Sequence, residues 1–185
     1  MILNVGESLG KQLQGRLHGR RDFARLCELL SAAPPGAVVF LDFAQVDLVT
    51  GSWLNAALVP LLRWAADERN DLFPVIINAR PEWLDDLALV AEFAHQCYLL
   101  GEGQTPRRAV LVGSLDPGQR TTLEALLEVA EATGAELERQ RPGDGVKATA
   151  WNNRLRDLYE KRLLRRVRHG REQRYSPVVK EVVLG

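Results

Sequence analysis

Side chains that can recognise a polyanion are concentrated between residues 147 and 180. This segment contains eleven Lys or Arg residues and three acidic residues, a net charge of +8, whereas residues 1–104 have a net charge of −5. Asn and Arg can hydrogen-bond to base edges, and Arg and Lys neutralise phosphates. The asymmetry therefore predicts that only the C-terminal part contacts a polyanion, although a solvated surface is the simpler explanation of any charge run.

A helix that begins near Ala148 is predicted to present these side chains. Its apolar positions have the i, i+4, i+7, i+8 spacing of one buried stripe: Trp151, Leu155, Leu158 and Tyr159. We interpret Trp151 as the first core residue of the helix rather than a base-stacking residue. The opposite face carries Thr149, Asn152, Asn153, Arg156 and Lys161. A basic β-hairpin is expected to follow directly and to turn at His169-Gly170, with Arg165, Arg166, Arg168, Arg171 and Arg174 around the turn.

Two further helices are predicted upstream, each with a clear start signal. Asp116-Pro117-Gly118-Gln119 places Asp at the N-cap, Pro at the first position and Gln at the third, and the helix should reach about Glu131. Thr133-Gly134-Ala135-Glu136 is a capping box that opens a short helix to about Gln140. Helix, short helix, turn, helix and basic hairpin is the order of a winged helix-turn-helix.

The segment NNRLRDLYEKRLLRR is also similar to the end of winged helix-turn-helix domains, and the similarity covers about residues 105–185. Arg162 stands where such domains usually have Gly, so a non-glycine residue is expected in the left-handed conformation just after the helix. The resemblance implies that the helix enters the major groove and that the hairpin meets the backbone or minor groove. The candidate DNA contacts are Lys147, Thr149, Asn152, Asn153, Arg156, Arg166, Arg168, His169, Arg171 and Arg174.

The first hundred or so residues alternate predicted strands and helices. Ala37 to Phe43 and Phe73 to Ala79 are continuous apolar runs, which are typical of strands buried on both faces. Helices are expected at about 19–32, 52–70 and 81–95, with Pro60 kinking the second or ending it early. Two more short strands, CYLLGE and RAVLVG, should follow. This alternation predicts an α/β sandwich with at least part of its sheet parallel.

Two stretches, ILNVGESLGKQL and LDFAQVDLVTGSWLNAALV, resemble the STAS-like domain family of unknown function, which is related to the STAS domains of bacterial anti-sigma-factor antagonists. The match covers about residues 1–104 and implies an interaction or dimerisation module. In the antagonists, a DSSG-like stretch at a helix start carries the phosphorylated serine. VTGSWL places Gly51 at that acceptor position, so Thr50 and Ser52 are the remaining candidate phosphorylation sites. The simpler role for Ser52 is the N-cap of its helix.

The sequence gives no basis for an enzyme, a metal site or a cofactor. His18, His95 and His169 have no partners at motif spacing, and GESLGK lacks the spacing of a phosphate-binding loop. Cys27 and Cys97 are expected to be reduced core residues of a cytoplasmic protein. Neither a targeting signal nor an apolar run of the roughly 18–20 residues that span a bilayer is present, so no membrane partner is expected.

The predicted architecture is an N-terminal STAS-like α/β sandwich, residues 1–104, followed by an α+β winged helix-turn-helix domain, residues 105–185. We expect a bacterial-type transcriptional regulator that binds double-stranded DNA and forms a homodimer, with the N-terminal domain available to a protein partner. The alternative is a protein-interaction adaptor of the anti-sigma-factor-antagonist type that does not bind DNA. RNA binding through the same basic face is a third, less favoured reading.

Overall fold

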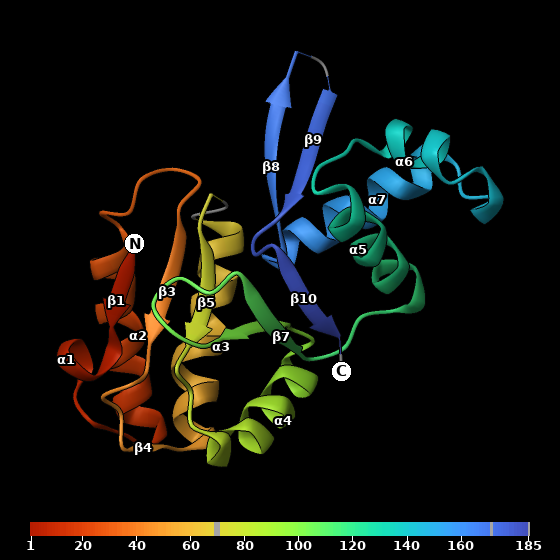
Figure 1. The fold of residues 1–185 in the computed structure, drawn as a ribbon. Coiled ribbons are helices and arrows are strands. Elements are labelled where there is room, and N and C mark those ends of the chain that lie inside the picture. The colour runs from red at the N-terminus through yellow and green to blue at the C-terminus, as the bar shows by residue number, and fades with distance from the viewer. Residues whose placement is uncertain (69–70, 171, 185) are drawn as a thin grey trace.

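A computed structural model describes residues 1–68, 71–170 and 172–184 (Figure 1). Its central feature is a six-stranded sheet with the strand order β1-β3-β5-β6-β7-β10. The strands are β1 (Ile2–Asn4), β3 (Val38–Asp42), β5 (Phe73–Ile77), β6 (Tyr98–Gly101), β7 (Arg108–Val112) and β10 (Glu181–Leu184). The first four run parallel, β7 runs antiparallel to β6, and β10 runs parallel to β7. The predicted α/β class with at least part of the sheet parallel is confirmed, and the observed sheet is mainly parallel.

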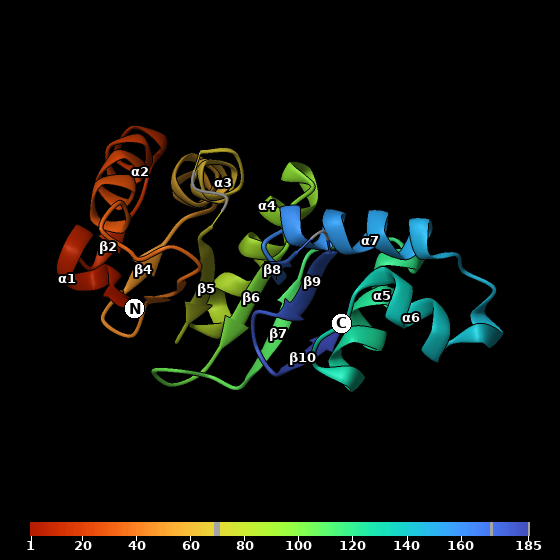
Figure 2. The same ribbon diagram turned by 90° about the horizontal axis from the view of Figure 1, so that it is seen from above.

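One face of the sheet is covered by three helices: α2 (Arg16–Leu30), α3 (Gly51–Asp67) and α4 (Leu84–Ala94). Figure 2 shows α2 and α3 side by side on this face. The core beneath them contains Val39 and Leu41 of β3 and Ile76 of β5. Four shorter elements complete this half: α1 (Val5–Leu9), β2 (Gln12–Leu13), β4 (Leu48–Val49) and the 3-10 turn η1 (Pro81–Trp83).

On the other face, the core extends from β5 to the C-terminal elements of the chain. These are α5 (Pro117–Val129), α6 (Gly134–Gln140), the 3-10 turn η2 (Pro142–Asp144), α7 (Ala148–Glu160), β8 (Leu164–His169) and β9 (Glu172–Pro177). Phe73, Val75 and Ile77 of β5 point into a core that also contains Leu123 of α5 and Leu155 of α7. The segments before and after residue 104 therefore share one hydrophobic core.

The two segments also share the sheet, because β7 and β10 both follow residue 104. β10 pairs with β7 in the register Val182↔Ala109 and Leu184↔Leu111. No strand was predicted at residues 181–184. β10 forms the edge of the sheet and lies against β7, the first strand after residue 104.

Capping residues in the sequence correctly predicted where several helices begin. Asp116 accepts the backbone N–H of Gln119 at 2.8 Å, and the Gln119 side chain accepts the backbone N–H of Asp116 at 3.3 Å. Thr133 and Glu136 form the same reciprocal pair, at 3.2 and 2.8 Å. Both predicted capping boxes are thus confirmed, and α7 begins at Ala148 as expected.

Three expectations about strands and helices in the N-terminal half need correction or refinement. The N-cap of α3 is Thr50 and not Ser52, because Gly51 is already helical. The helix also continues through Pro60 to Asp67 instead of ending early. β5 is buried at all five positions as predicted, whereas in β3 only Val39 and Leu41 are fully buried.

Candidate nucleic-acid interface

Helix α7 is anchored by the apolar stripe that its sequence predicts. Trp151, Leu155 and Leu158 are 0% exposed, so Trp151 is a core residue and not a stacking platform for a base. Their burial turns the opposite side of the first two turns to solvent. Thr149, Asn152, Asn153 and Arg156 are all exposed there.

The contact between α6 and α7 sets the angle at which this exposed side is presented. Asn152 Oδ1 accepts the backbone N–H of Gly134 at 3.1 Å. The helices approach so closely that a Cβ atom at Gly134 would lie 2.4 Å from Asn152 Oδ1 and 2.8 Å from the carbonyl oxygen of Ala148. A second bond, from the Ala148 N–H to the Glu138 carboxylate at 3.0 Å, fixes the start of α7. Asn152 therefore positions α7 through its side-chain oxygen, and its amide N–H groups remain available as donors to a ligand.

The side chains of Asn153 and Arg156 make fewer polar interactions within the protein. The Asn153 side chain has no hydrogen bond among the residues that the structure describes, and Arg156 lies 3.9 Å from the Glu160 carboxylate. Lys147, the N-cap of α7, is 83% exposed at its side chain and lies 3.7 Å from Glu138. Exposed ion pairs of this kind contribute little, so both cations can exchange them for phosphates at low cost.

The hairpin β8–β9 projects from the body of the molecule next to α7 (Figure 1). The strands pair from Leu164↔Pro177 at the base to His169↔Glu172 at the tip. Arg165, Arg168 and His169 are exposed, and Arg168 Nε donates to the Gly170 carbonyl at 3.0 Å. The expected hairpin and its position in the chain are confirmed. Arg171, one of the candidate DNA contacts, lies outside the described residues.

The two remaining arginines of the candidate set support the base of the hairpin. Arg174 is 29% exposed and pairs with Glu131 at 3.2 Å and Glu136 at 2.5 Å. The pKa of the Glu136 carboxyl is lowered by the hydrogen bond from the Thr133 backbone N–H and then by Arg174. Arg166 stacks over the ring of Tyr159, with its Cζ atom 4.2 Å from the ring centroid. Sequence reasoning placed these arginines on the hairpin but did not foresee their intramolecular partners.

A hollow of about 350 Å³ lies between α6, α7 and β9. It is lined by Thr133, Ala135, Asn152, Asn153, Arg156, Glu172, Gln173 and Tyr175. The hollow brings together three candidate residues of α7 and adds Thr133 and Gln173, which the sequence reasoning had not assigned to the site. Thr133 was recognised only as a helix cap, and Gln173 carried no signal in the sequence.

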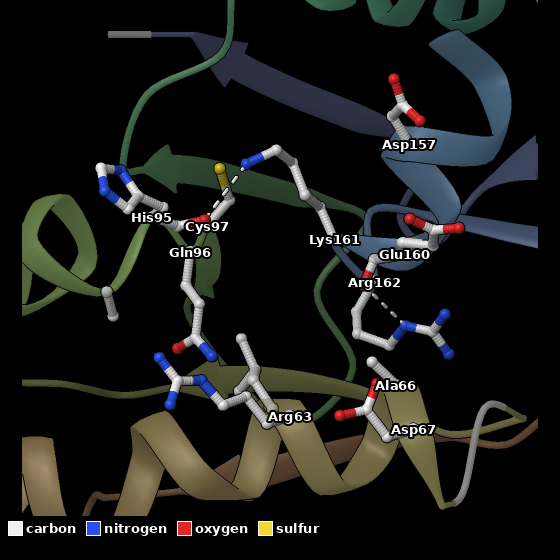
Figure 3. A pocket seen from close by; sticks show the side chains of 12 residues that line it. Arg63, Ala66, Asp67, His95, Gln96, Cys97, Asp157, Glu160, Lys161 and Arg162 are labelled. Carbon is white, nitrogen blue, oxygen red and sulfur yellow. Dashed lines mark hydrogen bonds between the residues drawn. The ribbon is translucent and has the colours of Figure 1, made fainter. Parts of the chain in front are cut away.

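The C-terminal end of α7 is held by contacts with both α3 and α4, around a cavity of about 290 Å³ (Figure 3). Lys161 Nζ donates to the His95 carbonyl at 3.3 Å, and Arg162 Nη1 donates to the Ala65 carbonyl at 3.3 Å. Arg162 has a φ of 62°, which confirms the left-handed residue expected after the helix. Cys97 also lines this cavity, and burial raises the pKa of its thiol. The thiol is therefore protonated and unreactive at neutral pH.

The candidate phosphorylation sites lie at the start of α3, remote from this surface. Thr50 Oγ1 accepts the backbone N–H of Trp53 at 3.4 Å and lies 3.1 Å from Ser52 Oγ. The Gly51 N–H donates to the Asp86 carboxylate at 3.0 Å. A phosphate on either hydroxyl would meet this carboxylate, and the like charges would repel.

No protein-family model, curated protein or solved structure matches this chain. Within the described ranges, no group of three or more His, Cys, Asp or Glu side chains is arranged to hold a metal ion. Likewise, none of the helices described has the length and apolar character required to cross a bilayer. The case for a function therefore rests on the geometry of α7 and the hairpin.

Proposed function

We propose that this protein is a DNA-binding transcriptional regulator in which residues 105–185 act as a winged helix-turn-helix. The order of α5, α6, α7 and the β8–β9 hairpin supports this. So does the segment between α5 and α6: Ala132 and Tyr175 exchange two backbone hydrogen bonds, at 3.0 and 2.9 Å. This isolated antiparallel bridge ties the segment between α5 and α6 to the hairpin.

The observation that carries the proposal is the exposed side of α7 beside a projecting arginine-rich hairpin. Asn153 and Arg156 are the side chains best placed to read base edges, because they are exposed and make few polar interactions within the protein. Asn can pair with adenine, and Arg can pair with guanine or bind a phosphate. Arg165, Arg168 and His169 would meet the backbone or the minor groove.

In this proposal residues 1–104 act as a STAS-like interaction module that mediates homodimerisation or binds a protein partner. The shared core and the β6–β7 pairing join that module directly to the part of the chain that contains α7. A two-fold dimer would present two copies of α7 to successive major grooves. Light scattering at tens of micromolar should give the dimer mass, and a monomer mass would remove the dimer from the proposal.

Gel-shift titration of the wild-type protein against a random-sequence duplex, at low and moderate salt, tests the proposal. We expect binding at low salt and weaker binding at moderate salt. Arg156→Ala and Arg168→Ala should each weaken it, whereas Arg21→Ala, which removes one exposed cation from α2, should not. Duplex RNA of the same sequence serves as the competitor, and preference for RNA would favour the third reading.

A protein-interaction adaptor of the anti-sigma-factor-antagonist type is the second candidate. Two intramolecular interactions favour it: Arg166 stacks on Tyr159, and Arg174 forms ion pairs with Glu131 and Glu136. Both arginines at the base of the hairpin therefore stabilise the fold in place of contacting a ligand. The same gel shift separates the two candidates, since an adaptor would not bind the duplex even at low salt.

A further inference from the structure

A groove of about 400 Å³ runs between α2 and α3, on the outer side of the helical layer. The two helices cross closely beside it, since a Cβ atom at Gly19 would lie 2.7 Å from the Cβ of Ala56. The groove is lined by Arg16, Arg20, Phe23, Asn55, Ala56, Val59, Pro60 and Arg63. It therefore combines three arginines and an asparagine with apolar side chains.

The charge of this groove is not balanced within the protein. Arg16, Arg20 and Arg63 are exposed, and none of them has an ion pair or side-chain hydrogen bond to any described residue. Among the described residues, no acidic side chain lines the groove. Three arginines elsewhere on the molecule are paired: Arg25 with Glu28, Arg80 with Asp47 and Arg141 with Glu128.

The placement of the cations also has an electrostatic cost. Arg16 lies in the first turn of α2, which contains no acidic residue. A cation there is disfavoured by the helix dipole, and gathering three like charges around one groove adds repulsion. Residues 1–104 carry a net negative charge, so the cluster is a local feature of this groove and not an average property of the segment. A bound anion would relieve both costs.

We propose that this groove binds a small organic anion that carries at least two negative charges beside an apolar body, such as a phosphate ester. Guanidinium groups bind phosphate and carboxylate oxygens through paired hydrogen bonds. Half-buried Phe23 and buried Val59 offer the apolar surface, and Asn55 offers a polar group for orientation. The volume lies within the range of small-molecule sites, about 300–1,000 Å³.

Arg63 connects this groove to the α7 anchor. It lines the α2–α3 groove on one side and the cavity around Lys161 and His95 on the other. Figure 3 shows its side chain beneath Gln96 at the edge of that cavity. An anion held by Arg63 would thus lie one side chain away from the contacts that fix the end of α7. The site stands independently of DNA binding.

Isothermal titration of the full chain with inorganic phosphate, pyrophosphate and ATP tests this site. We expect ATP to bind more tightly than pyrophosphate, because only ATP adds an apolar ring system. Arg20→Ala and Arg63→Ala should each weaken ATP binding about tenfold, the cost of one charge-assisted hydrogen bond. Arg21→Ala, on the same helix but outside the groove, should leave it unchanged. Thermal melts confirm that each variant is folded.

Three results would overturn the proposal. The first is the absence of heat with all three probes at millimolar concentration. The second is an equal loss of ATP binding in Arg21→Ala, or a loss that follows Arg168→Ala on the hairpin instead of the groove variants. The third is a loss of duplex-DNA affinity in Arg20→Ala and Arg63→Ala comparable to that of the hairpin variants, because the groove would then be part of a nucleic-acid surface.

Discussion

Tyr159, near the end of α7, packs edge-on against Phe73 at the start of β5, with ring centroids 6.0 Å apart and ring planes inclined by 61°. This contact joins the helix that presents the candidate DNA-binding residues to a central strand of the sheet. Tyr159 also lies beneath the guanidinium groups of Arg162 and Arg166, whose Cζ atoms are 4.3 and 4.2 Å from its ring centroid.

Tyr159→Ala should therefore destabilise the whole chain. Removing a buried aromatic ring of this size costs about 3–5 kcal/mol, and both arginines would lose their stacking partner. Urea denaturation followed by far-UV circular dichroism and tryptophan fluorescence should show one transition displaced to lower urea. Two separate transitions, only one of them displaced, would mean that the segments before and after residue 104 unfold independently.

Gly134→Ala tests the close approach of α6 and α7. The added methyl would overlap Asn152 Oδ1 and the Ala148 carbonyl, so the helices must separate. We expect a loss of about 1–3 kcal/mol in the free energy of unfolding and a weaker gel shift. Gly143→Ala is the matched control, since a Cβ there meets nothing within 4 Å. Equal behaviour of the two variants would show that the contact does not constrain α7.

Arg162 is predicted to remain stabilising despite its left-handed backbone. Glycine would relieve about 1 kcal/mol of backbone strain but would lose the hydrogen bond to Ala65 and the stacking on Tyr159, together about 2–4 kcal/mol. Alanine would lose the same contacts and keep the strain. Thermal melts should therefore rank wild type above Arg162→Gly, and Arg162→Gly above Arg162→Ala. A more stable Arg162→Gly protein would contradict this ranking.

Glu136 links the stability of the hairpin base to pH. Its folded-state pKa is below the ordinary value of 4.5, so the unfolded chain binds the proton more tightly. The stability that Glu136 contributes is therefore complete above that value and is lost as the pH falls through the folded-state pKa. The stability difference between wild type and Glu136→Gln should shrink as the pH falls from about 6 through the ordinary value of 4.5 and further into the acid range. A difference that stays constant over this interval would show that the ionised carboxylate contributes nothing.

Local chemistry explains which parts of the fold could be predicted. The capping boxes at Asp116 and Thr133 use residues three positions apart, so their signal is complete within a short segment. The left-handed conformation of Arg162 was anticipated differently, from the resemblance to winged helix-turn-helix domains, which usually have Gly at this position. Of the two effects expected of Pro60, a kink or an early end of α3, the early end does not occur, because tertiary packing on α2 and the sheet outweighs the local cost of proline.

Pairings between distant segments could not be predicted in the same way. The run Glu181–Leu184 is too short to identify its partner, and β7 lies far upstream in the sequence. The apolar strand Phe73–Ile77 indicated that both faces are covered, but not that α5 and α7 cover one of them. At the candidate site, the charges on Arg174, Glu131 and Glu136 were visible, whereas their mutual pairing depends on the folding of the hairpin against α5 and α6.

The salt dependence of duplex binding, measured by fluorescence anisotropy, tests the central claim most directly. For a protein that neutralises phosphates, the logarithm of the binding constant falls linearly with the logarithm of the salt concentration, by about 0.9 per phosphate. We expect a steep negative slope for wild type, a slope shallower by about 0.9 for Arg168→Ala, and a wild-type slope for Arg21→Ala. Absence of binding at low salt, or identical slopes for wild type and Arg168→Ala, would contradict DNA recognition by the hairpin.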